Sequence, residues 1–146
     1  MTDKLRHRTP LQVRFRDTDA FGHVNNAVFF SYIELARIRY FLDVLQPAEP
    51  FKGMPLILAR VELDFRSPIM FGEDVEVETQ VDRIGRSSIA MSHRMTANGR
   101  LVGDSQSVLV TYDYEIASPM PVPDEWRAKF AAHEGRAFEA EPVAAG

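Results

Sequence analysis

The sequence contains no cysteine, and this absence excludes several kinds of chemistry. A disulfide framework, a thiolate metal site and a cysteine nucleophile all need a cysteine side chain. A chain without cysteine also fits a reducing compartment, so we expect a cytoplasmic location. The four histidines have no ligand spacing, and we therefore expect no bound metal.

Positive charge and long apolar runs are also scarce. The chain has 17 Lys and Arg against 21 Asp and Glu, which gives a net charge of −4. Because non-specific nucleic-acid binding depends on clustered Lys and Arg, we expect no nucleic-acid partner. No run approaches the ~18 apolar residues of a membrane-spanning helix, and residues 1–10 lack the apolar core of a signal peptide. We therefore expect no association with a membrane.

Motifs of several enzyme classes are missing as well. The sequence has no Gly-x-Ser-x-Gly elbow, no phosphate-binding Gly-Lys-Ser/Thr loop and no dinucleotide fingerprint. These absences argue against a serine hydrolase and against a nucleotide-dependent enzyme, and we expect no cofactor.

The composition of the chain fits a single domain over residues 1–146. Its hydrophobic residues make up 45% and its charged residues 26%, as in ordinary soluble proteins. Residues 1–10 are polar and end at Pro10, so we predict a loose N-terminal arm. Residues 134–146 are rich in Ala and Glu without a periodic pattern, and we predict a disordered tail.

One long helix is the clearest element in the sequence. From Asn26 to Leu45, apolar residues recur at steps of three and four and cover most of the helix circumference, as in a buried helix. Asn25 and Asn26 are good N-cap residues, and Pro47 marks the end.

Alternating patterns indicate strands on both sides of this helix, and Asn98-Gly99 is a strong hairpin signal. A long helix needs a surface to cover it, and the sheet is the available one. We therefore predict an α+β fold with an antiparallel sheet wrapped around one central helix. The predicted strands are Gln12–Asp17, Leu56–Arg66, Asp74–Val81, Ser88–Met95 and Val102–Tyr114, and a short helix is predicted over Asp124–His133.

The segment from Val13 to Arg37 reads VRFRDTDAFGHVNNAVFFSYIELAR and resembles the opening of the 4-hydroxybenzoyl-CoA thioesterase-like family. In that family a strand ends in an Asp-bearing loop with Gly three residues later, and the central helix carries a Glu and an Arg. Later patterns match at 65–77 and 85–88, so the resemblance covers most of residues 11–115. The matching residues in the first segment are Asp19, Gly22, Glu34 and Arg37.

This resemblance implies a hotdog fold and the hydrolysis of acyl thioesters, with Asp19 as the catalytic aspartate. It implies an acyl-CoA or acyl-carrier-protein substrate and a homodimer or homotetramer in which each active site lies between two chains. The His23-Val24-Asn25-Asn26 stretch departs from members with aromatic residues there. The hydroxybenzoyl substrate is therefore not carried over.

Thioester hydrolysis needs a base or nucleophile and a donor that holds the carbonyl oxygen as it becomes negative. Asp19 lies just before a helix N-terminus, which offers unpaired N–H groups and the positive end of the helix dipole. The N–H of Asn26 is our candidate donor. Direct attack by Asp19 and activation of water by Asp19 are both open.

Other polar residues have a structural and a functional interpretation. His23 either orients the substrate and assists proton transfer or is a loop histidine bonded to backbone. Asn25 is a helix cap, with a contact to the acyl group as a second role. Glu34 either pairs with Arg37 on the helix surface or faces the site and the subunit interface.

The hairpin residues Arg86, Ser87 and Ser88 are candidates for binding a CoA phosphate, with a solvated hairpin corner as the alternative. We interpret Asp17 as structural and His93 as a packed sheet histidine. Two other functions stay open: a hotdog enoyl-thioester hydratase or dehydratase, and a non-catalytic module for acyl-thioester binding or dimerisation.

Overall fold

The computed structural model describes residues 7–50 and 53–138, and over these it has the predicted order of a strand, a long helix and further strands. The strands predicted after the helix are confirmed with bounds shifted by a few residues. The elements are β1 (His7–Gln12), a 3-10 turn η1 (Phe15–Asp17), α1 (Asn26–Leu45), β2 (Leu56–Phe65), β3 (Asp74–Ile84), β4 (Ser88–Ala97), β5 (Arg100–Asp113), β6 (Ser118–Pro119) and α2 (Asp124–Glu134).

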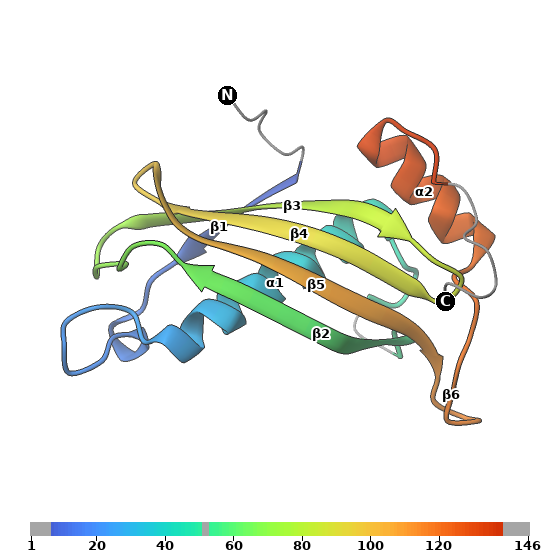
Figure 1. Cartoon of the computed structure of the whole chain (residues 1–146), viewed down its shortest axis with the longest axis horizontal. Helices are drawn as coiled ribbons and strands as arrows, with labels where there is room; N and C mark the ends of the chain where they lie inside the picture. Colours follow the sequence, from blue (N-terminus) through green and yellow to red (C-terminus); the bar gives the residue numbers. More distant parts are fainter. Residues whose placement is uncertain (1–6, 51–52, 139–146) are drawn as a thin grey trace.

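The strands form one antiparallel sheet in the order β1-β3-β4-β5-β2, and β6 pairs with β5. Figure 1 shows α1 lying along one face of this sheet and α2 beside one end of it. Among the described strands β2 pairs with β5 alone, so the outer edge of β2 is open. The predicted α+β architecture is confirmed.

Two hydrophobic clusters lie between α1 and the sheet. One surrounds the N-terminal half of α1 and includes Val77 and Met95, and the other surrounds the C-terminal half and includes Val81 and Met91. The sheet positions between these residues are polar.

His93 occupies the centre of this polar part of the sheet. It is buried, and its ring nitrogens lie 3.1 Å from Thr79 Oγ1 and 3.3 Å from Ser107 Oγ. Burial, together with the positive charge of Arg37, lowers the pKa of His93 to about 3, so the imidazole is neutral. The interpretation of His93 as a packed sheet histidine is confirmed.

One side of α1 is not covered in the single chain. The sequence predicts a helix buried nearly all round, but Phe30, Leu35 and Ile38 are 39%, 51% and 43% exposed. The reason is geometric, because the sheet covers only one face of the helix. Apolar residues on the other face need another partner.

The N-terminal prediction is wrong in two places. Residues 7–10 are not a loose arm but part of β1, which pairs with β3 from His7↔Thr79 to Gln12↔Asp74. Of the predicted strand Gln12–Asp17, only Gln12 belongs to a strand, because β1 ends there. Phe15–Asp17 form a 3-10 turn instead. Non-local pairing with β3 overrides the local alternation, and Pro10 is tolerated because β1 is an edge strand. Residues 1–6 lie outside the described residues.

The C-terminal prediction is wrong for Glu134. This residue ends α2, and its carboxylate accepts hydrogen bonds from Tyr40 Oη and from the N–H of Val81. The predicted helix over Asp124–His133 is confirmed, whereas the predicted tail lies mostly in residues 139–146, outside the described residues. Within the described ranges no helix is long and apolar enough to cross a membrane.

Replacing Glu134 tests whether α2 is fastened to the core by this carboxylate. Glu134→Ala leaves Tyr40 Oη and the Val81 N–H without their acceptor. We expect a loss of roughly 2 kcal/mol in the free energy of unfolding, because hydrogen bonds to charged groups contribute about 1.5–3 kcal/mol. Urea denaturation measures this, with the exposed Glu125→Ala as control. Equal stabilities of the two variants would contradict the assignment.

Candidate active site

A buried carboxylate fixes the loop that precedes α1. Asp17 is 2% exposed and accepts hydrogen bonds from Tyr32 Oη at 2.7 Å, from the Arg14 N–H at 2.9 Å and from the Arg14 guanidinium at 2.9 Å. Its own carbonyl accepts the N–H of Asn25 at 2.9 Å. Asp17 therefore ties the loop to the first turns of α1, and its structural interpretation is confirmed.

The environment of Asp17 keeps its carboxyl ionised. Burial alone raises the pKa of this group, but hydrogen bonds from Arg14 and Tyr32 outweigh burial and hold the pKa below its ordinary value. Burial and the same hydrogen bond raise the pKa of Tyr32, which stays protonated as the donor.

Asp19 lies two residues later in a tight turn. Its N–H donates to the carbonyl of His23 at 2.8 Å, and its carbonyl accepts from the N–H of Gly22 at 3.1 Å. Gly22 has φ +86°, a left-handed conformation that glycine adopts without strain. One carboxylate oxygen of Asp19 accepts the N–H of Phe21 at 2.9 Å, and the other has no partner in the described part of the chain. Asp19 is half-buried and has one oxygen available for chemistry.

The N-terminus of α1 follows directly. Asn25 is the N-cap, as predicted, and its Oδ1 accepts the N–H of Ala27 at 2.8 Å. The N–H of Asn26, the first residue of the helix, has no acceptor within residues 7–50 and 53–138. This N–H is the unpaired donor that the sequence predicts at the start of the helix.

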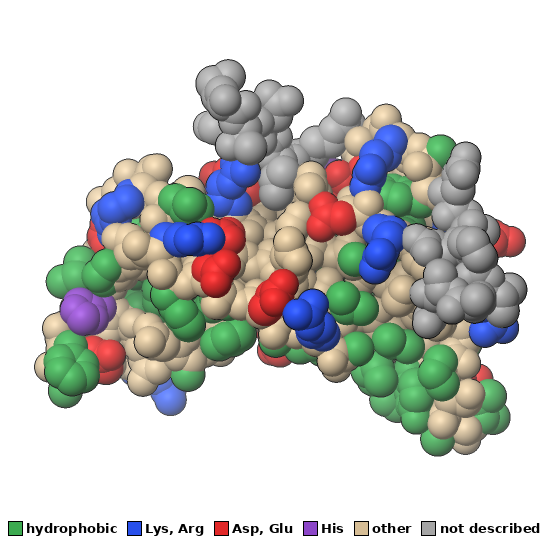
Figure 2. All heavy atoms as spheres, viewed as in Figure 1, with side chains coloured by type: hydrophobic (Ala, Val, Ile, Leu, Met, Phe, Trp, Pro, Cys, Tyr) green, Lys and Arg blue, Asp and Glu red, His purple; other side chains and the backbone are tan. Residues whose placement is uncertain are grey.

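His23 and Asn26 line a shallow pocket of about 290 Å³ between the start of α1 and the end of β2. The His23 ring stacks on Phe21 at 6.5 Å and makes no hydrogen bond to a described residue. Asp19 precedes these lining residues in the sequence, but its side chain does not line the pocket. Figure 2 shows hydrophobic side chains and a histidine at this end of the molecule. The most exposed aromatic residues of the region are Phe15, Phe21 and Phe71, at 78%, 82% and 58%.

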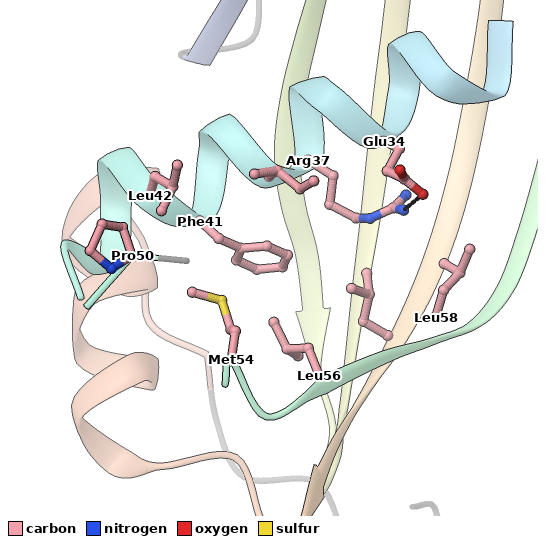
Figure 3. Close-up of a pocket in the computed structure, with 10 residues that line it drawn as sticks. Glu34, Arg37, Phe41, Leu42, Pro50, Met54, Leu56 and Leu58 are labelled. Carbon is pink, nitrogen blue, oxygen red and sulfur yellow. Dashed lines mark ion pairs between the residues drawn. The ribbon is translucent and has the colours of Figure 1, made fainter. Parts of the chain in front are cut away.

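Glu34 and Arg37 lie farther along α1, in a second and more apolar depression. This groove has a volume of about 360 Å³ between the C-terminal half of α1 and β2. Figure 3 shows the Glu34 and Arg37 side chains next to each other on its wall. Their ion pair is 4.0 Å long; the Glu34 side chain is 64% exposed and that of Arg37 is 7% exposed. The sequence points to Glu34 as the site residue, whereas Arg37 is the buried member of the pair.

Arg86, Ser87 and Ser88 lie at the opposite end of the sheet from Asp19. They form the corner between β3 and β4, next to the cluster that surrounds the C-terminal half of α1. The Ser87 carbonyl accepts the N–H of Thr111 and the Arg86 carbonyl accepts the N–H of Val122, so these bonds tie the corner to β5 and to the segment before α2. A single chain therefore does not bring the predicted phosphate-binding residues to the Asp19 loop.

No cluster of three or more His, Cys, Asp or Glu side chains in the described residues has the arrangement of a metal site. The constellation at the start of α1 thus consists of a carboxylate, an imidazole and an unpaired backbone donor. A donor for a developing oxyanion and a carboxylate for water or direct attack are the groups that acyl transfer needs. An antiparallel sheet packed on one long helix is the hotdog arrangement, and these groups are the ones expected of a hotdog acyl-transfer hydrolase.

Comparison with known proteins agrees with this class. The model of the thioesterase-like superfamily matches residues 13–130. A thioesterase from Thermus thermophilus, solved with coenzyme A and Zn, is 40% identical with a TM-score of 0.85, and the match covers 94% of this chain and 100% of that one. The long-chain acyl-CoA thioesterase FadM of Escherichia coli (strain K12) is 23% identical over 129 residues, which cover 84% of this chain and 95% of that protein.

A third relative, the uncharacterised protein YsmA of Bacillus subtilis (strain 168), is 30% identical over 83 residues, which span 57% of this chain and 56% of that protein. The chain belongs to the thioesterase-like superfamily. The predicted family resemblance, hotdog fold and thioester hydrolase activity are confirmed.

Replacing Asp17 tests the anchor of the loop that carries Asp19. Asp17→Asn should lower the free energy of unfolding at neutral pH by about 2 kcal/mol, since hydrogen bonds to charged groups contribute about 1.5–3 kcal/mol. The folded pKa is depressed, so this stabilisation is present above the ordinary value of 3.8 and is lost as pH falls through the folded pKa. Denaturant unfolding should therefore show that the difference in free energy of unfolding between wild type and Asp17→Asn shrinks as the pH falls across this range.

The matched control is Asp64→Asn, which removes an exposed carboxylate paired with Arg66. Exposed pairs contribute about 0.2–1 kcal/mol, so this variant should stay close to wild type. A stability difference between wild type and Asp17→Asn that does not change with pH would contradict the role of the Asp17 charge.

Proposed function

We propose that the protein hydrolyses acyl-CoA to the free acid and CoA at the start of α1. The observation that carries the proposal is the unpaired N–H of Asn26 directly after the turn that holds Asp19. In this proposal the thioester oxygen accepts the Asn26 N–H, and the helix dipole adds to the stabilisation of negative charge on that oxygen. Removing one such donor typically costs about 2.7–4 kcal/mol of barrier.

Asp19 supplies the second requirement. Its free carboxylate oxygen either takes a proton from water or attacks the carbonyl carbon to form an anhydride that water then hydrolyses. In either route the thiolate of CoA leaves and the acyl group ends as a carboxylic acid. His23, on the wall of the same pocket, orients the substrate or assists proton transfer to the leaving thiolate.

The relatives support a CoA thioester as the substrate. The structure with 40% identity contains coenzyme A, and the E. coli relative is a long-chain acyl-CoA thioesterase. In one chain the Arg86–Ser88 corner lies at the far end of α1, roughly 30 Å from Asn26 for a helix of this length. Contact between this corner and CoA bound at Asn26 therefore requires a second copy of the chain.

The surface of the chain supports such an assembly. The open edge of β2 lies beside the uncovered face of α1, where Leu35 and Ile38 are exposed. Pairing two β2 edges satisfies their backbone groups, and packing the exposed faces of α1 buries apolar surface. We include a homodimer or homotetramer, with sites between chains, in the proposal.

Thiol release from short, long and aromatic acyl-CoAs tests the activity. Asp19→Asn keeps the shape of the turn and its acceptor for the Phe21 N–H, but it removes the base or nucleophile. Turnover should fall at least ~10²-fold, the usual worth of general base catalysis. The exposed Asp124→Asn is the control and should act like wild type. Near wild-type turnover by Asp19→Asn would remove this residue from its role.

Light scattering at micromolar concentration tests the assembly. We expect a mass that is two or four times the 16.6 kDa of one chain. Leu35→Glu places a charge on the uncovered face of α1 and should shift the protein towards the monomer, because an unpaired charge is costly in an interface. The control Ile116→Glu lies on an exposed turn and should leave the mass unchanged. A monomeric wild type would contradict the proposal.

A further inference from the structure

The groove beside Arg37 has the form of a small-molecule site. Its volume of about 360 Å³ lies within the ~300–1,000 Å³ typical of ligand pockets. The described residues that line it are apolar except for Glu34 and Arg37, which lie together (Figure 3). The apolar lining residues are Ile38, Phe41, Leu42, Pro50, Met54, Leu56, Leu58 and Leu109.

Arg37 is a buried cation with weak compensation. The residue is 6% exposed, and no described residue accepts a hydrogen bond from its guanidinium. Its one ion pair within the described residues, to Glu34, is 4.0 Å long, which is too long for a hydrogen bond, and the Glu34 side chain is largely in solvent. Burial lowers the pKa of Arg37, and the distant Glu34 carboxylate only partly opposes this effect.

The surroundings of Arg37 in the described part of the chain supply one carboxylate, that of Glu34. The sheet side chains below it are His93, which is neutral, and the hydroxyl groups of Thr79 and Ser107. A buried charge is normally paired and hydrogen-bonded, and a guanidinium matches a carboxylate with two parallel hydrogen bonds. The groove therefore offers a place for a second carboxylate at this point.

The groove and the pocket at Asn26 lie along one side of α1, with Phe30 between them. Asn26, Phe30, Glu34, Ile38 and Leu42 follow at intervals of four residues, so they form one stripe on the helix. The eight residues from Asn26 to Glu34 correspond to a rise of about 12 Å. An extended chain spans about 1.2 Å per bond, so about ten bonds connect the Asn26 N–H to the level of the Glu34–Arg37 pair.

We propose that this groove binds the acyl part of the substrate and that Arg37 binds a carboxylate at its far end. The substrate class is then the CoA monothioesters of medium-chain dicarboxylic acids, with about ten to twelve carbons for the reach given above. The inference rests on the proposed function for the position of the thioester at Asn26. Arg37 is a specificity residue and takes no part in bond breaking.

Matched substrates test this assignment. We would measure kcat/KM for dodecanoyl-CoA, the CoA monothioester of dodecanedioic acid and the CoA thioester of ω-hydroxydodecanoic acid. The wild type should prefer the dicarboxylic substrate by about 10-fold or more, as expected for a charge-assisted hydrogen bond that the other two lack. A wild type that prefers either of the others, or shows no preference, would overturn the inference while the proposed hydrolysis stands.

The variant Arg37→Met replaces the buried cation with an apolar side chain, and the carboxylate that it leaves behind, that of Glu34, is 64% exposed and stays solvated. It should lose the preference, so that the ratio of kcat/KM for the dicarboxylic substrate to kcat/KM for dodecanoyl-CoA falls by about 10-fold or more relative to wild type. Arg39→Met, two residues away and exposed, is the matched control and should keep the preference. If Arg37→Met does not fold, the substrate preference of the wild type alone still tests the inference.

Calorimetric binding of free dodecanedioate separates this inference from the proposed function, because it needs no turnover. Wild type and Arg39→Met should bind it about 10-fold or more tightly than Arg37→Met. If no thioester is hydrolysed but this difference is found, the proposed function fails and the carboxylate site remains. Equal binding by all three proteins would overturn the site.

Discussion

The hydrogen bonds that Asp17 accepts from Tyr32 and Arg14 are the interaction on which the rest of the site depends. They hold a loop of irregular backbone against the first turns of α1, so that Asp19 and the N–H of Asn26 keep a fixed relation. Only the carboxylate of Asp17 is buried, whereas the Arg14 side chain is 64% exposed. Loss of the Asp17 charge would therefore weaken the hydrogen bonds that hold the loop to Tyr32 and Arg14. The two neighbouring aspartates thus differ: Asp17 is buried and structural, and Asp19 is accessible.

The uneven covering of α1 accounts for where the site lies. The sheet buries one face of the helix, and the opposite face remains apolar and uncovered beside the open edge of β2. Both depressions, at the start of α1 and beside Arg37, follow this uncovered side. The second copy that we propose would turn this open cleft into an enclosed one, and enclosure strengthens the electrostatic interactions that an acyl-transfer site uses.

Local signals in the sequence predict much of this structure, and the misses share a cause. The bounds of α1 and the turn at Asn98-Gly99 depend on capping and backbone preferences, which a short segment contains. The position of β1 depends instead on its pairing with β3, which joins segments far apart in the chain. The burial of Arg37 is missed for a similar reason, since a pattern places it on a helix but does not show how deeply the sheet and β2 bury it. The separation of Asp19 from the β3–β4 corner is likewise a tertiary property.

The polar patch around His93 gives the core a sensitivity to acid that its apolar clusters do not have. In the folded chain this imidazole stays neutral down to a pKa of about 3, whereas an unfolded histidine takes a proton near pH 6.5, about its ordinary pKa. Between these values only the unfolded chain binds this proton, so each unit of acidification removes up to about 1.4 kcal/mol from the fold. One imidazole in the middle of the sheet thus makes the stability of the whole fold depend on pH in mild acid.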